Sequence, residues 1–246
     1  MGSVSKPAGS FNVKKIAIIG AGPSGLAAAK FLVAERAFDI IDIFEQQSQV
    51  GGVWNYTPHI AGPIPVPQNT PHAPLDPPIW SSSVGAPLFS NPMYEQLNTN
   101  IPKTLMQFSD LDFPSESLLF PTREDVQDYL VKYAQDIRHL ISFSQQVKDV
   151  RLMHYGWDIT IKSTITKETR RANYDAIVIA NGHYSVPYIP SVQGIEAFNA
   201  AYPSIIQHSK LYRSPAPFVG KKVIVVGSAA SGLVRTIDHH VIIPSS

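Results

Sequence analysis

The stretch KKIAIIGAGPSGLAAAKFLVAERAFDIIDIFE, residues 14–45, decides the fold. It begins with a β-branched run that ends at a glycine (14–20), continues with an alanine- and leucine-rich segment (26–37) and closes with a second apolar run (39–45). These patterns predict a strand, a helix and another strand. Because two strands joined through a helix are parallel and right-handed, the sequence predicts an α/β fold with a parallel sheet.

The glycine turn of this unit, GAGPSG at residues 20–25, has the GxGxxG spacing of a dinucleotide-binding loop. We expect Gly20 to permit the tight turn, Gly22 to let a pyrophosphate approach the backbone, and Gly25 to let helix and strand pack closely. The helix that follows offers N–H groups and partial positive charge to the pyrophosphate. Glu45, at the end of the next strand, is expected to accept hydrogen bonds from a ribose. The alternative is a glycine turn without a ligand.

A second run of the same kind lies near the other end of the sequence. KKVIVVG (221–227) repeats the pattern of residues 14–20, and GSAASG (227–232) repeats the loop spacing with Ala229 in place of the second glycine. Two such loops indicate two dinucleotides, and hence hydride transfer from a nicotinamide to a flavin. The sequence thus predicts a Rossmann-like FAD-binding domain followed by the beginning of a second, NADPH-binding Rossmann-like domain. The alternative for the second loop is a strand-turn-helix with only a packing role.

Composition excludes several classes of function. The chain has 246 residues, 20 basic and 19 acidic side chains and no cysteine. The near-balanced charge offers no field to attract nucleic acid or an anionic membrane, and the absence of cysteine excludes disulfide and thiolate-metal chemistry. No apolar run approaches the ~20 residues of a membrane helix. We therefore expect a cytoplasmic protein that binds neither nucleic acid nor membrane.

The domain organisation follows from the distribution of proline. Residues 1–12 are expected to form a flexible tail, residues 13–187 the FAD-binding domain, and residues 188–246 a connection and the incomplete NADPH-binding domain. Ten of the 21 prolines fall within 58–92, so neither helix nor central sheet can persist in this excursion. It is either ordered or mobile, and its large side chains favour packing against the rest of the protein; these are Trp80, Leu88 and Phe89.

Further elements are expected along the FAD-binding domain. Residues 121–138 predict a helix with Thr122 as N-cap, and residues 93–97 predict one or two helical turns. Strands are expected near 147–152, 157–163 and 174–180. Alternating WDITIK indicates a half-buried strand, whereas continuous YDAIVIA indicates a strand buried on both faces.

Four further segments make the sequence resemble the flavin-containing monooxygenase family over nearly its whole length. They are GGVWNY (51–56), SNPMYEQLNTNIPK (90–103), IANGHYSVPYIP (179–190) and YPSIIQHSKLY (202–212). The last is similar to the family motif FxGxxxHxxxY, with Tyr202 for Phe and Ser204 for Gly, and it retains His208 and Tyr212. Related Baeyer–Villiger enzymes have Trp at the position of Tyr212, so the resemblance favours the N- and S-oxygenating branch with fungal and plant members.

The resemblance implies an oxidoreductase that uses FAD, NADPH and O2 to oxygenate a small amine or thioether. In this family, reduced flavin and O2 form a C4a-hydroperoxyflavin, which a soft nitrogen or sulfur nucleophile attacks. The asparagine of the family's TN pair lies beside the flavin and the nicotinamide amide, which makes Asn100 the predicted catalytic residue. The alternative is that Asn100 caps a turn before Pro102.

The predicted cofactor-binding residues fall along most of the chain. They are Gly20, Gly22, Pro23, Ser24, Gly25, Glu45, Gln46, Gly52, Val53, Trp54, Asn100, Gly182, His208, Tyr212, Gly227, Ser228, Ala229, Ser231 and Gly232. No metal site is predicted. His239 and His240 are neighbours in a helix-like segment, and adjacent helical side chains point in different directions and cannot chelate one ion together.

Family members are longer than this sequence, so the resemblance implies a chain truncated within the second domain. We expect an NADPH- and FAD-dependent monooxygenase seen as a fragment or short form. The alternatives are a flavin-dependent NAD(P)H reductase or dehydrogenase, and a truncated, non-catalytic flavin-binding chain. The sequence specifies neither the substrate nor whether the chain forms a homo-oligomer.

Overall fold

The computed structural model of the chain describes residues 12–60 and 62–227. The chain divides into two compact units, each of which is described by itself. Unit 1 comprises residues 1–48 and 136–181, and unit 2 comprises residues 49–135 and 182–246. Both units are discontinuous in sequence, and the domain boundary at residues 187–188 stays a prediction.

Unit 1 is built on a four-stranded parallel sheet with the strand order β5-β2-β1-β9. The strands are β1 (Lys15–Ile19), β2 (Ile40–Phe44), β5 (Ile141–Ser142) and β9 (Ala176–Ile179). Helix α1 (Pro23–Glu35) connects β1 to β2. The predicted strand-helix-strand unit and the α/β fold class are therefore confirmed.

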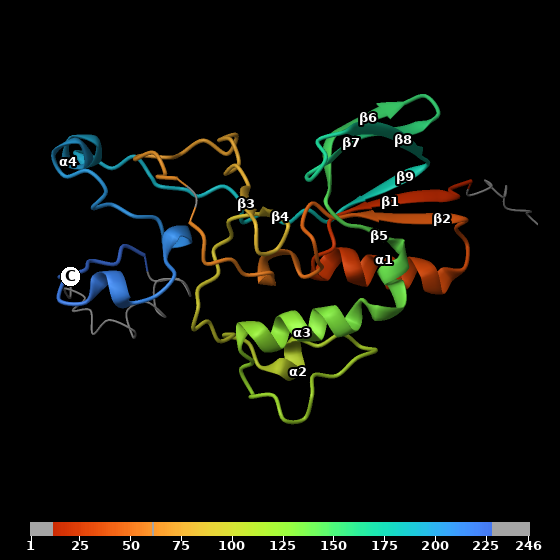
Figure 1. The fold of residues 1–246 in the computed structure, drawn as a ribbon, viewed down its shortest axis with the longest axis horizontal. Helices are drawn as coiled ribbons and strands as arrows, with labels where there is room; N and C mark the ends of the chain where they lie inside the picture. The colour runs from red at the N-terminus through yellow and green to blue at the C-terminus, as the bar shows by residue number, and fades with distance from the viewer. Residues whose placement is uncertain (1–11, 61, 228–246) are drawn as a thin grey trace, which may run out of the picture. The chain divides into compact units, whose positions relative to one another are not determined.

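The two faces of this sheet are covered by different structures (Figure 1). Helix α1 lies along one face, and a three-stranded antiparallel sheet lies over the other. That second sheet consists of β6 (Gln145–Met153), β7 (Gly156–Ser163) and β8 (Thr169–Tyr174). Because the glycine turn follows β1 and precedes α1, it lies at the carboxyl end of the parallel strands. This is the end at which α/β sheets bind ligands.

The core between the two sheets uses the inward-facing residues of β7. Ile159 and Ile161 are buried and pack with Ala17, Phe44 and Tyr174, whereas Lys162 is exposed. The predicted half-buried alternation of 157–163 is thus confirmed. The Tyr174 hydroxyl donates a hydrogen bond to the Asp42 carboxylate over 2.6 Å, so the one polar group of this cluster is paired.

The last two strands of unit 1 depart from the sequence-based expectation. β8 escapes prediction because its TRRANY sequence lacks a β-branched run and alternates only weakly. The prediction that 174–180 is buried on both faces is wrong, since Ile179 is 67% exposed. β9 is an edge strand of the described sheet, and one of its sides has no neighbouring strand there.

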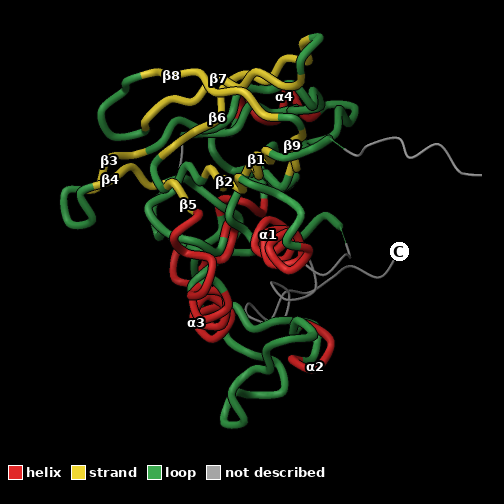
Figure 2. The backbone as a smooth tube through the Cα atoms, turned by 90° about the vertical axis from the view of Figure 1, so that its right-hand side faces the viewer, coloured by secondary structure: helices red, strands yellow, loops and turns green. Residues whose placement is uncertain are grey.

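Unit 2 is mostly loop, with short elements along it (Figure 2). In chain order these are η1 (Gly52–Trp54), β3 (Ile79–Ser81), β4 (Ala86–Leu88), α2 (Lys103–Met106), α3 (Arg123–Tyr133), α4 (Ile195–Ala201), η3 (Ser209–Leu211) and η4 (Ala216–Phe218). β3 and β4 form a small antiparallel hairpin inside the proline-rich excursion. As expected, no helix and no central sheet strand forms within the described residues of 58–92.

Helix α3 begins as the sequence predicts. Thr122 is its N-cap, and a capping box joins Thr122 and Asp125. The hydroxyl of Thr122 accepts from the Asp125 N–H at 3.2 Å, and the Asp125 carboxylate accepts from the Thr122 N–H at 2.9 Å. The α-helix ends at Tyr133, earlier than predicted. The last part of the predicted 121–138 helix instead belongs to a 3-10 segment, η2 (Gln135–Leu140).

Among the large side chains expected to anchor the proline-rich excursion, Leu88 and Phe89 are half-buried, whereas Trp80 is not, and polar contacts hold the segment in its place. Trp80 is 54% exposed. Instead, Gln68 pairs its backbone with that of Ile189, and the buried Lys210 ammonium lies 2.5 Å from the Asp76 carboxylate. The paired backbone groups and the buried ion pair offset the conformational entropy that the segment loses on ordering. The apolar residues of the segment give no sign of these contacts.

Two short predicted elements are absent from the described residues. Residues 93–97 form a turn, because the Met93 N–H bonds to the Asn91 side chain and the Glu95 N–H bonds to the Arg213 carbonyl. These bonds take up N–H groups and favour a turn over a helix. Residues 221–227 are not in a strand, and Ile224 and Val226 are 78% and 93% exposed.

Candidate functional site

The glycine loop of unit 1 has no room for side chains at two of its glycines. Gly20 has a φ of +105°, and a Cβ there would lie 2.5 Å from the Ala180 carbonyl oxygen. A Cβ on Gly25 would lie 1.9 Å from the Gly20 carbonyl oxygen. Gly20 therefore makes the tight turn, and Gly25 allows the helix to pack against it, as the spacing predicts.

The middle glycine of the loop begins helix α1. Gly22 is the N-cap residue and is buried, and Pro23 occupies the first helical turn. The first N–H groups of any helix lack intrahelical partners, so the exposed Ser24 and its neighbours place backbone donors at this end. A diphosphate is a chemical match for such an end, because the helix dipole and the N–H groups favour an anion.

Glu45 lies directly beside this loop. Its Oε2 accepts a hydrogen bond from the Ala21 N–H at 2.8 Å, and its Oε1 accepts one from the Gln47 N–H at 2.9 Å. The side chain is only 4% exposed, and burial raises its pKa while the backbone donors lower it. A carboxylate has about four acceptor positions, so two bonds leave capacity for hydroxyl donors. Its role toward a ribose stays a prediction.

Gln46 is held against the second sheet of unit 1. Its side-chain oxygen accepts from the Gln146 amide at 2.9 Å, and its carbonyl accepts from the Thr164 hydroxyl at 3.2 Å. These contacts fix the backbone just after β2. Gln46 thus supports the position of Glu45, and a direct contact with a cofactor is untested.

In unit 2, the GGVW segment forms a turn that only glycine fits. Gly51 and Gly52 have φ values of +114° and +58°, and η1 begins at Gly52. A Cβ on Gly51 would lie 2.1 Å from the side-chain oxygen of Gln127. Gln127 also donates from Nε2 to the Val50 carbonyl at 2.8 Å. Motif reading missed Gln127, since its only signal is the position one helical turn after Arg123 on α3.

Gln127 supplies an orphaned polar atom beside this segment. Its Oε1 is buried and has no hydrogen-bond partner within the described residues. Within unit 1, the backbone N–H groups at the start of α1 and the Glu45 carboxylate bonded to Ala21 offer donors to a diphosphate and acceptors to a sugar. The residues present are therefore compatible with a dinucleotide.

The other predicted site residues of unit 2 occupy varied positions. Asn100 is exposed, and the neighbouring turn is closed by Thr99, whose hydroxyl donates to the Ile101 carbonyl at 2.8 Å. The His208 ring accepts from the Lys210 N–H at 3.0 Å and so caps η3. Tyr212 is buried and packs edge-on against Tyr94. The structure thus gives His208 and Tyr212 packing contacts and leaves the Asn100 side chain accessible.

Both remaining predicted glycines have positive φ. Gly182 and Gly227 have φ values of +71° and +111°, and a Cβ at either would meet no atom of the described residues within 4 Å. The other residues of the second loop lie outside the described residues; they are Ser228, Ala229, Ser231 and Gly232. His239 and His240 lie outside them as well.

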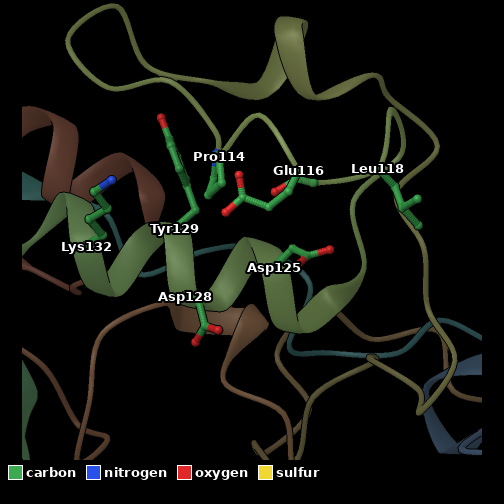
Figure 3. A pocket seen from close by; sticks show the side chains of 8 residues that line it. Pro114, Glu116, Leu118, Asp125, Asp128, Tyr129 and Lys132 are labelled. Carbon is green, nitrogen blue, oxygen red and sulfur yellow. The ribbon is translucent and has the colours of Figure 1, made fainter.

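A hollow of about 370 Å³ in unit 2 contains none of the predicted site residues (Figure 3). It lies between α3 and the loop at 114–118, and Glu116, Asp128 and Lys132 are among the side chains around it. Within residues 12–60 and 62–227, no cluster of His, Asp and Glu has the arrangement of a metal site. None of the helices in this part of the chain combines the length and apolar character needed to cross a bilayer.

Comparison with known proteins identifies the family. The profile described as "Flavin-binding monooxygenase-like" matches residues 89–240, more than half of the chain, and one described as "NAD(P)-binding Rossmann-like domain" matches residues 18–76. The chain belongs to the flavin-binding monooxygenase-like family.

Individual members of this family resemble the chain over most of its length. The thiol-specific monooxygenase of Saccharomyces cerevisiae is 32% identical over 89% of this chain and 45% of its own length. The trimethylamine monooxygenase of Pelagibacter sp. is 32% identical over 89% of this chain and 46% of its own. The structure of S-allyl-L-cysteine S-oxygenase from Allium sativum has a TM-score of 0.75 at 29% identity, covering 92% of this chain and 48% of that one.

Membership of the flavin monooxygenases explains the two glycine motifs. Flavin monooxygenases use FAD and NADPH, and the sequence profiles cover both predicted loops. The resemblance seen in the sequence and the Rossmann-like fold class are therefore confirmed. The chain spans about half the length of the curated relatives it matches.

Proposed function

We propose that this chain carries the FAD-binding part, and the beginning of the NADPH-binding part, of a monooxygenase that oxygenates a soft nitrogen or sulfur atom of a small molecule. The names of its relatives support this substrate class, since one acts on thiols, one on trimethylamine and one on the sulfur of S-allyl-L-cysteine. The whole protein would use NADPH and O2. We place it in the cytoplasm on the basis of its composition.

Bound FAD would supply the redox chemistry, by accepting hydride from NADPH and activating O2. The chain's own residues would bind and orient it. The N-terminus of α1 would hold the pyrophosphate, and Glu45 would accept hydrogen bonds from a ribose. Residues 52–54 would line the flavin, and the exposed Asn100 amide would offer a donor and an acceptor to flavin or nicotinamide.

The observation that carries the proposal is the geometry around Gly20–Gly25. The loop at the start of a 13-residue helix has no room for a Cβ at Gly20 or Gly25, and the Glu45 carboxylate accepts a hydrogen bond from the Ala21 N–H of the loop. This combination matches the needs of an anionic diphosphate joined to a sugar. The absence of cysteine argues against the disulfide-reducing flavoproteins, which share the two-loop layout.

The variant Gly22→Asp, which adds a negative charge to the loop, tests the proposal. Gly22 has φ −77° and ψ −178°, and Asp is a favoured N-cap residue, so the helix should form. A carboxylate at this position would repel the diphosphate, and we expect FAD affinity to fall by at least ~100-fold. Gly62→Asp adds the same charge at an exposed position with no atom near its Cβ, and should bind FAD normally.

Titration with FAD, followed by quenching of flavin fluorescence, measures both variants. Normal binding by Gly22→Asp would refute the assignment of the loop. Anaerobic addition of NADPH to the FAD-loaded chain, followed by mixing with O2 in the presence of an amine or thioether, then separates the alternatives. Bleaching followed by transfer of oxygen to an amine or thioether supports the monooxygenase, bleaching with release of peroxide alone favours a reductase, and no bleaching favours a non-catalytic flavin-binding chain.

A further inference from the structure

Helix α3 has two different faces within unit 2. On one, Tyr129 and Tyr133 stack with Phe113 and Phe108 at centroid distances of 4.0 and 4.1 Å. The Tyr129 hydroxyl also donates to the Leu111 carbonyl at 2.7 Å. These aromatic contacts hold the backbone of α3 in place, and so they also fix the positions from which its other side chains extend.

The other face of α3 contacts the segment at residues 50–56. Arg123 and Gln127 are four residues apart and therefore lie one turn from each other on the same side of the helix. The Arg123 guanidinium carbon lies 4.0 Å from the centre of the Tyr56 ring. Gln127 contacts Val50 and Gly51. The segment is thus held by α3 at both ends, with the GGVW turn between the two contacts.

The contact of Gln127 with the turn is close and specific. Its Nε2 donates to the carbonyl of Val50, a fully buried residue, at 2.8 Å. Its amide group lies against the α-carbon of Gly51, since a Cβ built there would be 2.1 to 2.9 Å from three of its atoms. One amide therefore fixes the carbonyl before the turn and fills the space beside its first glycine.

Gln127 makes this contact with one polar atom left unpaired. Its Oε1 is buried and has no hydrogen-bond partner in the described part of the chain. Burying an unpaired acceptor opposes folding, and such exceptions concentrate at functional sites, where geometry matters more than stability. A leucine or methionine would fill the position without this cost, but neither could hold the Val50 carbonyl.

We propose that Gln127 is a positioning residue for the flavin, which acts by fixing the backbone of residues 50–54 rather than by touching the cofactor. The inference rests on the proposed function, because it assumes that this segment contacts FAD. Since the Oε1 atom is buried, a ligand could not reach it without rearrangement, which is why the role is assigned to the turn and not to direct contact.

FAD titration of the whole chain tests this role with two Gln127 variants and a control. Gln127→Met keeps the length and helix propensity but removes the amide, and Gln127→Glu keeps the shape but turns a carboxylate oxygen toward the Val50 carbonyl. We expect the Kd for FAD to rise about tenfold for Met and further for Glu. Asp128→Ala alters the next residue, which leaves α3 in a different direction from Tyr129 (Figure 3), and should stay within about twofold of wild type.

The visible circular dichroism of FAD at saturation distinguishes positioning from general stabilisation. We expect Gln127→Met to alter this signal, because a displaced turn changes the surroundings of the flavin. Weaker binding with an unchanged signal, or Glu binding as tightly as wild type, would overturn the positioning role. If wild-type protein itself takes up no FAD, it is the proposed function that fails, and the two results are therefore distinguishable.

Discussion

The runs KKIAIIG and KKVIVVG share one pattern, two lysines, four apolar residues and a glycine, but they differ in structure. The first contains β1, which pairs with β2 on one side and β9 on the other, and Ile18 is fully buried. The second is not in a strand, and Val226 is 93% exposed. Since the two runs share the same apolar pattern, the difference comes from neighbouring strands, which the second run does not have among the described residues.

This difference shows what a β-branched run specifies by itself. Such residues fit a pleated and buried surface, but the stabilisation comes from cross-strand partners and burial. The same reasoning applies to the glycines. Gly20 and Gly227 both have positive φ, but only Gly20 is closely surrounded.

Truncation of one apolar side chain in each run should test this difference most clearly. Ile18→Ala removes a fully buried side chain from the centre of the sheet, and we expect unit 1 to lose about 2–5 kcal/mol of unfolding free energy. Val226→Ala should change stability by less than about 0.5 kcal/mol, because the side chain is exposed. Urea unfolding measures both. Similar losses for the two variants would mean that the second run is buried in solution.

Alanine variants of the first glycine in each loop distinguish the cost of backbone strain from the cost of a steric clash. Gly20→Ala and Gly227→Ala both force alanine to a φ above +100°, which costs about 1–2 kcal/mol. Only the first also places a Cβ 2.5 Å from a carbonyl oxygen, so we expect a total loss of about 3 kcal/mol there. Thermal unfolding of the two variants gives the difference. Equal losses would contradict the close approach of Ala180 to Gly20.

Glu45 gives the smallest expected effect, and a pH series of unfolding free energy measures it. Burial raises the pKa of Glu45 above its ordinary value of 4.5 in the folded state. A raised pKa contributes stability below the unfolded-state pKa, and this contribution is lost as pH rises through the folded-state pKa. Glu45→Gln cannot ionise and should lack this decline. Parallel pH profiles of unfolding free energy for the two proteins would contradict the raised pKa.

Most of unit 1 could be predicted from sequence, because its patterns are local. Strand, glycine turn and helix follow one another within residues 14–45, and in unit 2 the N-cap at Thr122 is likewise marked by its own neighbours. The exposure of β9 could not be predicted, since an edge position depends on which strands lie beside it. For the same reason, the run at 221–227 looks like a strand in sequence and is not one in the structure.

The candidate site was predictable where a motif requires glycine. A Cβ at Gly20, Gly25 or Gly51 would lie too close to a neighbouring atom, and Gly20 and Gly51 also have a positive φ. These constraints explain why the motifs have glycine at these positions. Contacts from distant parts of the chain could not be predicted. Gln127 follows Gly51 by 76 positions, and nothing local to α3 indicates that its amide binds the Val50 carbonyl. The pairing of Lys210 with Asp76 is equally invisible, because ion pairs leave no periodic pattern.

The stoichiometry of FAD on the purified chain tests the central claim most directly. Visible flavin absorbance, compared with protein concentration after removal of free cofactor, should give one FAD per chain, because the loop at residues 20–25 and the acid at Glu45 already have the arrangement that a flavin dinucleotide needs. A folded chain that remains colourless after incubation with excess FAD would contradict the assignment of that loop as a flavin site.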